Sequence, residues 1–369
     1  MRCDGRSAWG VHRGIASLCI LIGFLAGCGQ PPNWLDDGGR LARPRSRVGR
    51  YAAATLGGAS YVDPNNLGPH GYKGRWGEKT GIVYTCRGGH IDIAHVRKSA
   101  DWAAYLSLQV RRAIQKGQTE FSFKPPEPSR HYIVLEYPPG WNDLDARERD
   151  RITDEISMAV GRYLAFNGCV WHEMLTWFGY SSIRFYPDFP SAFSWEDTYS
   201  DLLGAHIGIA ALRDTRHPYS EAVALALAEQ LEALGLQPKR TAIRASEKAR
   251  GLWYTGDFLF LVNMKKRNFD IGLDDGHITP WLVPGLAGCE GAEPKPLAVP
   301  DLDVLSEHGF AMRFEIEPKS LEKGQILAIA YPDEAQRSKR IEPAVHFGPI
   351  MAHIRADGVR RYGPDVDVP

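Results

Sequence analysis

The stretch GIVYTCRGGHIDIAHVRKSADW, residues 81–102, contains both kinds of element that the fold needs. Its first six residues are rich in β-branched and aromatic side chains, which is typical of a short strand, and turn residues follow them. From Ile91 the apolar residues recur at helical spacing, and this pattern continues to Gln115. The sequence therefore predicts a hairpin that leads directly into a long helix.

The rest of the chain divides into a helical part and a part with strand patterns. Four more helices are expected, over residues 149–178, 195–212, 220–234 and 241–250. After Gly251 we expect four strands: DFLFLVNM (257–264), FAMRFEIEP (310–318), QILAIAYP (325–332) and PIMAHIRADGVRRYG (349–363). The predicted fold class is α+β, with a mainly helical domain over residues 51–250 and a β-rich C-terminal region over residues 251–369.

The amino terminus has the pattern of a bacterial lipoprotein signal peptide. Arginines precede an apolar run of roughly a dozen residues, Ile15–Ala26, which is the length of a signal-peptide core rather than of a membrane span. Small residues then precede Cys28. We expect removal of residues 1–27, acylation of Cys28 and a flexible tether over residues 28–50. The alternative is a secretory signal peptide beside an incidental cysteine.

The environment and partners of the chain follow from these features. Gly29, rather than aspartate, follows the modified cysteine, which favours an outer-membrane lipoprotein that faces the periplasm. Lysine plus arginine and aspartate plus glutamate each number 44, so no net charge attracts nucleic acid. The expected partner is the membrane, through the lipid anchor. Cys86, Cys169 and Cys289 remain in the mature chain, which permits at most one internal disulfide.

A 100° advance per residue sorts the side chains of the first helix into two faces. The face that should be buried carries Asp92, His95, Ser99, Trp102 and Leu106. The opposite face carries Arg97, Lys98 and Asp101. A buried carboxylate must be paired, hydrogen-bonded or bound to a metal. His90 projects with the charged side or precedes the helix as a loop, so it is a weaker candidate ligand.

Two further helices add ionisable residues. On the second, Glu173 lies at the edge of the apolar face, whereas His172 points away. Thr176 stands where a zincin motif requires its second histidine, which excludes that class. On the third, Ser194 and Asp197 resemble a capping box, and His206 lies among apolar residues. The four residues that could together bind a divalent metal, zinc being the best suited, are Asp92, His95, Glu173 and His206.

These residues support two hypotheses of different classes. The first is a metal-dependent hydrolase of an envelope substrate such as peptidoglycan, lipid or peptide, with Glu173 as a ligand or as the general base. The second is a non-catalytic binding or assembly lipoprotein, in which the same residues form a buried polar network and Asp92 caps its helix. The chain has no phosphate loop, no Rossmann glycine motif, no Gly-x-Ser-x-Gly and no Cys-x-x-Cys.

Two weaker candidates remain. Cys86 could be a thiol nucleophile with His90 or His95 as its base, although a cysteine at the end of an apolar strand is more often structural. His70, in a Gly-Pro-His-Gly turn, could bring another metal ligand from a loop.

Four segments together resemble a family of bacterial lipoprotein-like proteins known only as a domain of unknown function. They are LGPHGY (67–72), GIVYTCRGGHIDIAHVRKSADW (81–102), WHEMLTWFGYSS (171–182) and SAFSWEDTYSDLLGAHIG (191–208). The resemblance covers about residues 67–208. It implies an envelope location and a shared fold, and it implies no catalytic role for any residue.

Overall fold

The computed structural model describes residues 34, 42–50, 52–53, 60–181, 188–256 and 262–369. The expected signal peptide, Cys28 and most of the expected tether lie outside these residues. Residues 32–369 belong to one compact unit. Among the described residues, no helix is both long enough and apolar enough to cross a membrane.

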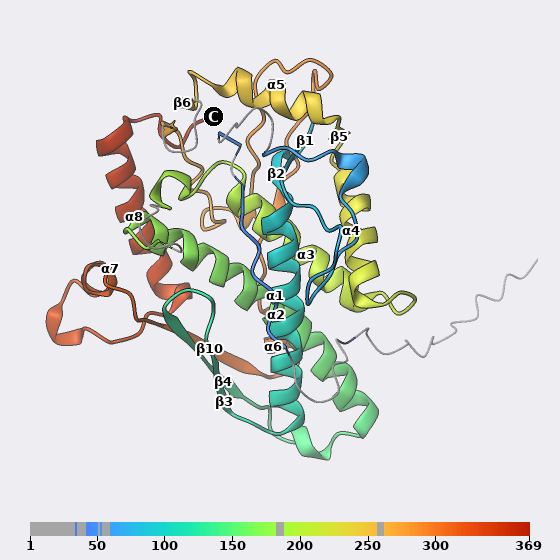
Figure 1. Ribbon diagram of the computed structural model, residues 1–369. Helices are drawn as coiled ribbons and strands as arrows, with labels where there is room; N and C mark the ends of the chain where they lie inside the picture. Colours follow the sequence, from blue (N-terminus) through green and yellow to red (C-terminus); the bar gives the residue numbers. More distant parts are fainter. Residues whose placement is uncertain (1–33, 35–41, 51, 54–59, 182–187, 257–261) are drawn as a thin grey trace, which may run out of the picture. The chain divides into compact units, whose positions relative to one another are not determined.

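Three long helices form the centre of the unit (Figure 1). They are α1 (Ile93–Gln115), α2 (Ala146–Trp177) and α3 (Asp197–Arg213). Glycines let their backbones approach closely: a Cβ added at Gly161 of α2 would lie 2.1 Å from Ser107 Oγ, and one added at Gly204 of α3 would lie 2.3 Å from the Val96 carbonyl oxygen. Both neighbours belong to α1, so this helix has α2 and α3 packed directly against it.

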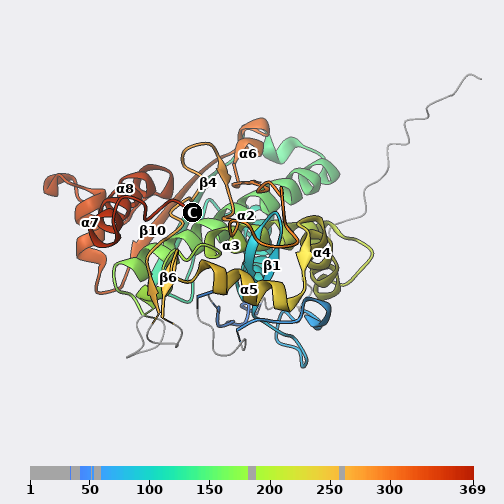
Figure 2. The ribbon, with the colours of Figure 1, turned by 90° about the horizontal axis from the view of Figure 1, so that it is seen from above.

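Two further helices complete the set predicted from the sequence, α4 (Tyr219–Ala233) and α5 (Lys239–Ala249). All five expected helices are therefore confirmed within a few residues of their expected ends. Seen from above, α4 lies on one side of the central helices and the C-terminal helices α7 and α8 lie on the other (Figure 2).

Two three-stranded antiparallel sheets flank the helices. The first has the order β2 (Gly89–Asp92), β1 (Ile82–Thr85), β5 (Leu236–Gln237), with Val83 opposite Ile91, and it confirms the predicted hairpin. The second has the order β10 (Ala311–Pro318), β4 (Ser129–Glu136), β3 (Glu120–Phe123), with Ala311 opposite Glu136. Two-stranded pairs complete the described strands: β6 (Tyr254–Thr255) with β7 (Asn263–Met264), and β8 (His277–Ile278) with β9 (Leu297–Ala298).

The region from Gly251 onward is not β-rich. Of its expected strands, 310–318 is confirmed as β10, and residues 257–261 of the first lie outside the described residues. The other two are helices: 325–332 overlaps α7 (Lys323–Ala330), and 349–363 lies almost wholly in α8 (Pro343–Tyr362). The remaining short helices are α6 (Asp303–Glu307), η1 (Pro64–Asn66), η2 (Trp141–Asp143), η3 (Phe189–Ser191) and η4 (Glu334–Gln336).

The spacing of buried residues explains why α8 is a helix. Those residues recur three and four positions apart, at Phe347, Ile350, Met351, Ile354 and Gly358. Pro343 stands in the first turn, where a missing N–H costs nothing. The expected strand began at Pro349, which lies inside this helix. Because the residues before Pro349 were left out of the expected element, their helical spacing was not recognised.

Contacts also cross the expected domain boundary near Gly251. Strand β10 pairs with β4 along its whole length, and a disulfide joins Cys86 to Cys289. Residues from both sides of the boundary, such as Leu164 and Ile354, share the larger hydrophobic core. The C-terminal region is therefore part of the same compact unit as the helices before it.

Candidate functional site

A cavity of about 650 Å³ lies between α1 and α2. Helix α1 lines it with His95, Lys98, Trp102 and Leu106. Helix α2 lines it with Leu164, Ala165, Gly168, Cys169, His172, Glu173 and Thr176. The wall is completed mainly by residues 46–50 of the N-terminal segment, by Phe123 and residues 125–127, and by His131 and Asp197. Its size is that of a typical small-molecule site.

His95 stands between two carboxylates at one end of this cavity. Its Nδ1 lies 3.3 Å from Asp92 Oδ2 and 3.1 Å from Asp197 Oδ1. Asp92 is the N-cap of α1: its Oδ1 accepts a 2.8 Å hydrogen bond from the Ala94 N–H, and its Oδ2 accepts a 2.7 Å bond from the Arg50 N–H. Backbone groups therefore hold the Asp92 carboxylate against the imidazole. We call Asp92, His95 and Asp197 the His95 centre.

The Asp197 carboxylate is held in a similar way. Its Oδ2 accepts hydrogen bonds from the Ser194 N–H at 3.2 Å and from the Ser194 hydroxyl at 2.8 Å, which leaves Oδ1 for His95. The expected Ser194 and Asp197 pair is thus present, although α3 begins at Asp197 and its N-cap is Glu196.

Glu173 and Lys98 add two more charged groups to the same end of the cavity. Glu173 Oε2 accepts a 2.8 Å hydrogen bond from the Phe193 N–H. Phe193 has a φ of 54°, which is unfavourable for a bulky residue, so the surrounding structure must hold its backbone in this conformation. Lys98 Nζ lies 3.8 Å from Asp201 Oδ1. The cluster therefore joins α1, α2, α3 and the segment before α3.

Burial without enough positive charge perturbs the ionisation of these groups. Burial raises the pKa of Asp92 to about 6. Burial and the Asp197 charge raise the pKa of Glu173 to about 8. Burial and Lys98 oppose protonation of His95, but Asp201, Asp92 and Asp197 outweigh them and raise its pKa to about 10. His95 is therefore an imidazolium in this arrangement, and carboxylates still outnumber cations.

The structure brings three of the four expected metal ligands to one place and leaves the fourth elsewhere. Asp92 contacts His95, and His95 and Glu173 both line this end of the cavity and interact electrostatically. His206 lies apart from them, half-buried, with Nε2 2.9 Å from the Ala298 carbonyl oxygen. Helix α3 is buried on nearly all sides, so the apolar pattern could not show which face His206 occupies.

The weaker candidates have clear positions. His172 lines the cavity instead of pointing away from it, and burial lowers its pKa to about 3. His90 is buried in β2, where its Nδ1 accepts a 3.3 Å hydrogen bond from Trp195 Nε1 and burial lowers its pKa to about 3. Cys86 is bonded to Cys289 and so offers no thiol. His70 Nε2 lies 2.9 Å from Asp101 Oδ1, on the other side of α1.

The helical-phase argument failed to identify Asp197, Asp201 and Lys98. Asp197 and Asp201 are spaced four apart and lie on the same stripe of α3 as Gly204 and Gly208. Both glycines contact α1, because a Cβ at either would lie 2.3 Å from an α1 carbonyl oxygen. The spacing of these glycines in the sequence could therefore have predicted that this side of α3, which also carries Asp197 and Asp201, faces another helix.

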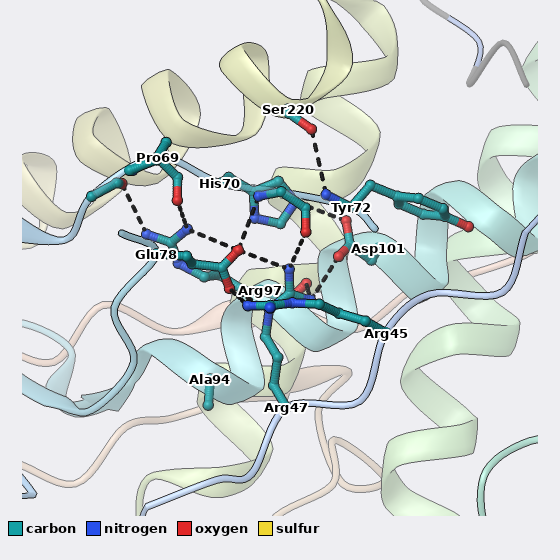
Figure 3. Close-up of polar contacts among 12 residues, drawn as sticks. Arg45, Arg47, Pro69, His70, Tyr72, Glu78, Ala94, Arg97, Asp101 and Ser220 are labelled. Carbon is teal, nitrogen blue, oxygen red and sulfur yellow. Dashed lines mark hydrogen bonds and ion pairs between the residues drawn. The ribbon is translucent and has the colours of Figure 1, made fainter. Parts of the chain in front are cut away.

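The expected charged face of α1 is buried too. The N-terminal segment and the loop before β1 cover it, and the side chains of Arg45, Arg47 and Arg97 converge there on Glu78 and Asp101 (Figure 3). Arg47 donates to Asp101 Oδ2 at 2.7 Å and to Glu78 Oε1 at 2.6 Å. We call these five residues, together with His70, the arginine network.

The arginine network holds the N-terminal segment over the His95 centre. A Cβ added at Gly49 would lie 2.8 Å from His95 Nε2 and 3.1 Å from Asp92 Oδ2. The next residue supplies the backbone N–H that binds Asp92. The network thus fixes residues 46–50, which are distant in sequence from α1 and form one wall of the cavity.

Comparison with known proteins gives one match. Neither the curated proteins nor the solved structures yield a match to this chain. Among the described residues, no group of three or more His, Cys, Asp or Glu side chains is arranged as a ready metal site. Residues 50–274, more than half of the chain, match a family model described as protein of unknown function (DUF4056), and the chain belongs to that family.

Proposed function

We propose that this protein is a periplasm-facing outer-membrane lipoprotein that hydrolyses a small envelope molecule in the cavity, with a divalent cation bound at the His95 centre. The observation that carries the proposal is the position of His95 Nδ1, 3.3 Å from Asp92 Oδ2 and 3.1 Å from Asp197 Oδ1. Donor atoms that share an ion at bond lengths near 2.1 Å lie roughly 3.0 to 3.4 Å from one another. The two separations fall in this range.

The hydrogen bonding of His95 supports the same proposal. Its Nδ1 is buried and, among the described residues, makes no well-directed hydrogen bond, although both carboxylate oxygens are near. A buried nitrogen normally has such a partner. An ion that replaced the Nδ1 proton would satisfy the nitrogen and both oxygens together. Among the described residues, these three side chains are not already arranged as a metal site. Small side-chain rotations would therefore be needed to complete it.

The charge balance favours a cation over a neutral occupant. Among the described residues, five buried carboxylates interact at this end of the cavity with three cations: Asp92, Glu173, Glu196, Asp197 and Asp201 with His95, Lys98 and Arg267. The pKa values of Asp92 and Glu173 are raised by burial, so each ionised form is under-compensated. A divalent ion would supply the missing positive charge. Zinc suits the imidazole and manganese suits the carboxylates, and both belong in the test.

The cavity residues have natural roles in hydrolysis. A bound cation lowers the pKa of a water molecule. Glu173 would accept the proton of that water as general base, and its hydrogen bond from the Phe193 N–H holds the carboxylate in place. Lys98 would stabilise negative charge that develops on the substrate oxygen.

The disulfide supports the proposed location. Cys86 and Cys289 are joined, and such bonds persist mainly in oxidising compartments such as the periplasm. This agrees with a signal peptide that ends before Cys28. The alternative function, a binding lipoprotein, is favoured by Asp92, whose hydrogen bonds already make it a complete helix cap.

Cation uptake separates the two functions. The protein from residue 29 onward would be titrated with Zn²⁺ and with Mn²⁺ by calorimetry, and its metal content would be measured after purification without chelator. We expect one ion per chain in the wild type and in the control His206→Gln, and loss of uptake in Asp197→Asn and His95→Gln. A wild-type protein that takes up neither ion would overturn the hydrolase proposal and leave the binding function.

A further inference from the structure

We propose that the substrate is a single-chain amphiphile, in which one acyl chain is joined to a polar head by an ester or amide. The acyl chain lies along Trp102, Leu106, Phe123 and Leu164, and the ester or amide reaches the His95 centre. This inference rests on the proposed function for the reaction, but its binding step can be tested separately.

The polarity of the cavity changes along its length. On α1, the lining residues His95 and Lys98 are followed by Trp102 and Leu106. Helix α2 runs in the opposite direction beside it, because Cys169 Sγ lies 4.0 Å from Ser99 Oγ while Gly161 packs on Ser107. Its lining residues accordingly change from Glu173 and His172 to Ala165 and Leu164. Both helices therefore place ionisable groups at one end and apolar groups at the other.

Aromatic rings complete the apolar end. Trp102 and Phe123 have ring centroids 6.5 Å apart, and both line the cavity. From His95 to Leu106 the helix rises roughly 16 Å, which gives the cavity the length of a medium acyl chain rather than of a compact metabolite. An apolar end of this length matches a linear hydrocarbon.

A polar pair lies on the wall between the two ends. Glu127 and His131 line the cavity, and Glu127 Oε1 lies 4.0 Å from His131 Nε2. Glu127 is 4% exposed, and within the described part of the chain its Oε1 has no hydrogen-bond partner. A Cβ at Gly168 would lie 3.9 Å from His131 Cε1, which places the pair between the levels of Leu164 and Glu173 on α2. The unsatisfied oxygen is suited to a hydroxyl or amide N–H of the ligand.

The probe for binding carries an uncharged head group, so that its binding does not depend on whether the His95 centre holds a cation. A hydroxyl or amide N–H of that head group can bond to Glu127 Oε1. A monoacylglycerol has this chemistry, which makes it a suitable probe.

Binding would be measured as displacement of the fluorescent apolar probe N-phenyl-1-naphthylamine by monoacylglycerols of increasing chain length. We expect affinity to rise about fourfold per methylene until the chain fills the apolar end, and then to level off. In Ala165→Trp the affinity should level off at a shorter chain, because the indole fills part of that end. The matched control Ala352→Trp, at an exposed position of α8, should behave as wild type.

Turnover and cation uptake are read separately from binding. Hydrolysis of p-nitrophenyl esters from acetate to decanoate should show the same chain-length preference, shifted in Ala165→Trp and unchanged in Ala352→Trp. Chain-length-dependent binding without cation uptake would support this inference and overturn the proposed hydrolysis. An affinity that does not depend on chain length, or a chain-length dependence that Ala165→Trp leaves unchanged, would overturn this inference even if the cation is bound.

Discussion

Helix α1 carries a buried charged cluster on each of two sides, and the two clusters differ in how well their charges are matched. In the arginine network, Arg45, Arg47 and Arg97 meet Glu78 and Asp101. Burial opposes ionisation of Glu78, but the hydrogen bond and charge of Arg47 outweigh it and lower the Glu78 pKa to about 2. In the His95 centre and beside it, burial raises the pKa values of Asp92 and Glu173.

The opposite directions of these pKa shifts distinguish a structural cluster from a candidate site. The arginines of the network compensate the Glu78 carboxylate, although burial lowers the pKa of Arg97 to about 10, and the cluster mainly fixes the position of the N-terminal segment. A cluster whose carboxylates lack enough nearby positive charge can instead be stabilised by a cation or ligand that binds in the adjacent cavity. The comparison therefore predicts that the arginine network matters most for stability and the His95 centre most for ligand binding.

The largest expected effect is on stability, from breaking the arginine network. Asp101→Ala removes the partner of Arg47, His70 and Tyr219 and leaves buried donors unpaired. We expect the free energy of unfolding to fall by about 3 to 5 kcal/mol, as measured by urea denaturation. Asp101→Asn, which keeps an acceptor oxygen, should cost about 1 to 3 kcal/mol.

An exposed ion pair provides the control for this loss. Arg151 pairs with Glu148 and Glu155 on the surface of α2. Because solvent screens this pair, Arg151→Ala should cost less than about 1 kcal/mol. A similarly small cost for Asp101→Ala would show that the network does not hold the N-terminal segment in place.

A smaller effect is expected on the pH dependence of stability. The folded pKa of Glu173 is about 8, above its ordinary value, so the folded state binds its proton more tightly and stability falls as pH rises from about 4.5 to about 8. The raised pKa of His95, about 10, acts in the same direction above about pH 6.5. Glu78, with its lowered pKa, loses its contribution as pH falls from about 4.5 to about 2. Burial lowers the pKa values of His90, His131 and His172 to about 3, so these residues reduce stability as pH falls below about 6.5. Stability without divalent ions should therefore be highest between about pH 5 and about pH 6.5.

Glu173→Gln isolates the cavity contribution to this curve. In EDTA, the decline in unfolding free energy between pH 5 and pH 8 should be smaller in the variant than in the wild type by roughly 3 kcal/mol. Glu120→Gln, at an exposed position on β3, should leave the decline unchanged. If both variants decline as steeply as the wild type, Glu173 is adequately compensated and the contrast between the two clusters is wrong.

The sequence predicted the helices well because each repeats its apolar residues at helical spacing over several turns. It failed in 325–332 and 349–363, where apolar runs are short and fit a strand as well as a helix. For the site, helical phase placed Asp92 and His95 together on a buried side of α1, and of the two, His95 lines the cavity. It could not show that residues 42–50 and 60–79 cover the opposite face, because periodicity identifies a polar face and not whether that face is exposed. The contributions of Asp197 and Asp201 required contacts between helices, which a single helix does not reveal.

The smallest expected effect on stability, and the most specific to the His95 centre, comes from Gly49→Ala. The added Cβ would lie 2.8 Å from His95 Nε2, so the imidazole must rotate by a small amount away from its position between Asp92 and Asp197. Unfolding free energy should change by less than about 1 kcal/mol, since the substitution lies on the cavity wall and adds only one methyl group. Zinc affinity measured by calorimetry should fall about tenfold, as expected when a ligand is misplaced. Gly324→Ala, where nothing lies within 4 Å of the new Cβ, is the control for zinc binding and should keep the wild-type zinc affinity. If Gly49→Ala binds zinc as tightly as the wild type, the N-terminal segment does not position His95, and the two clusters act independently.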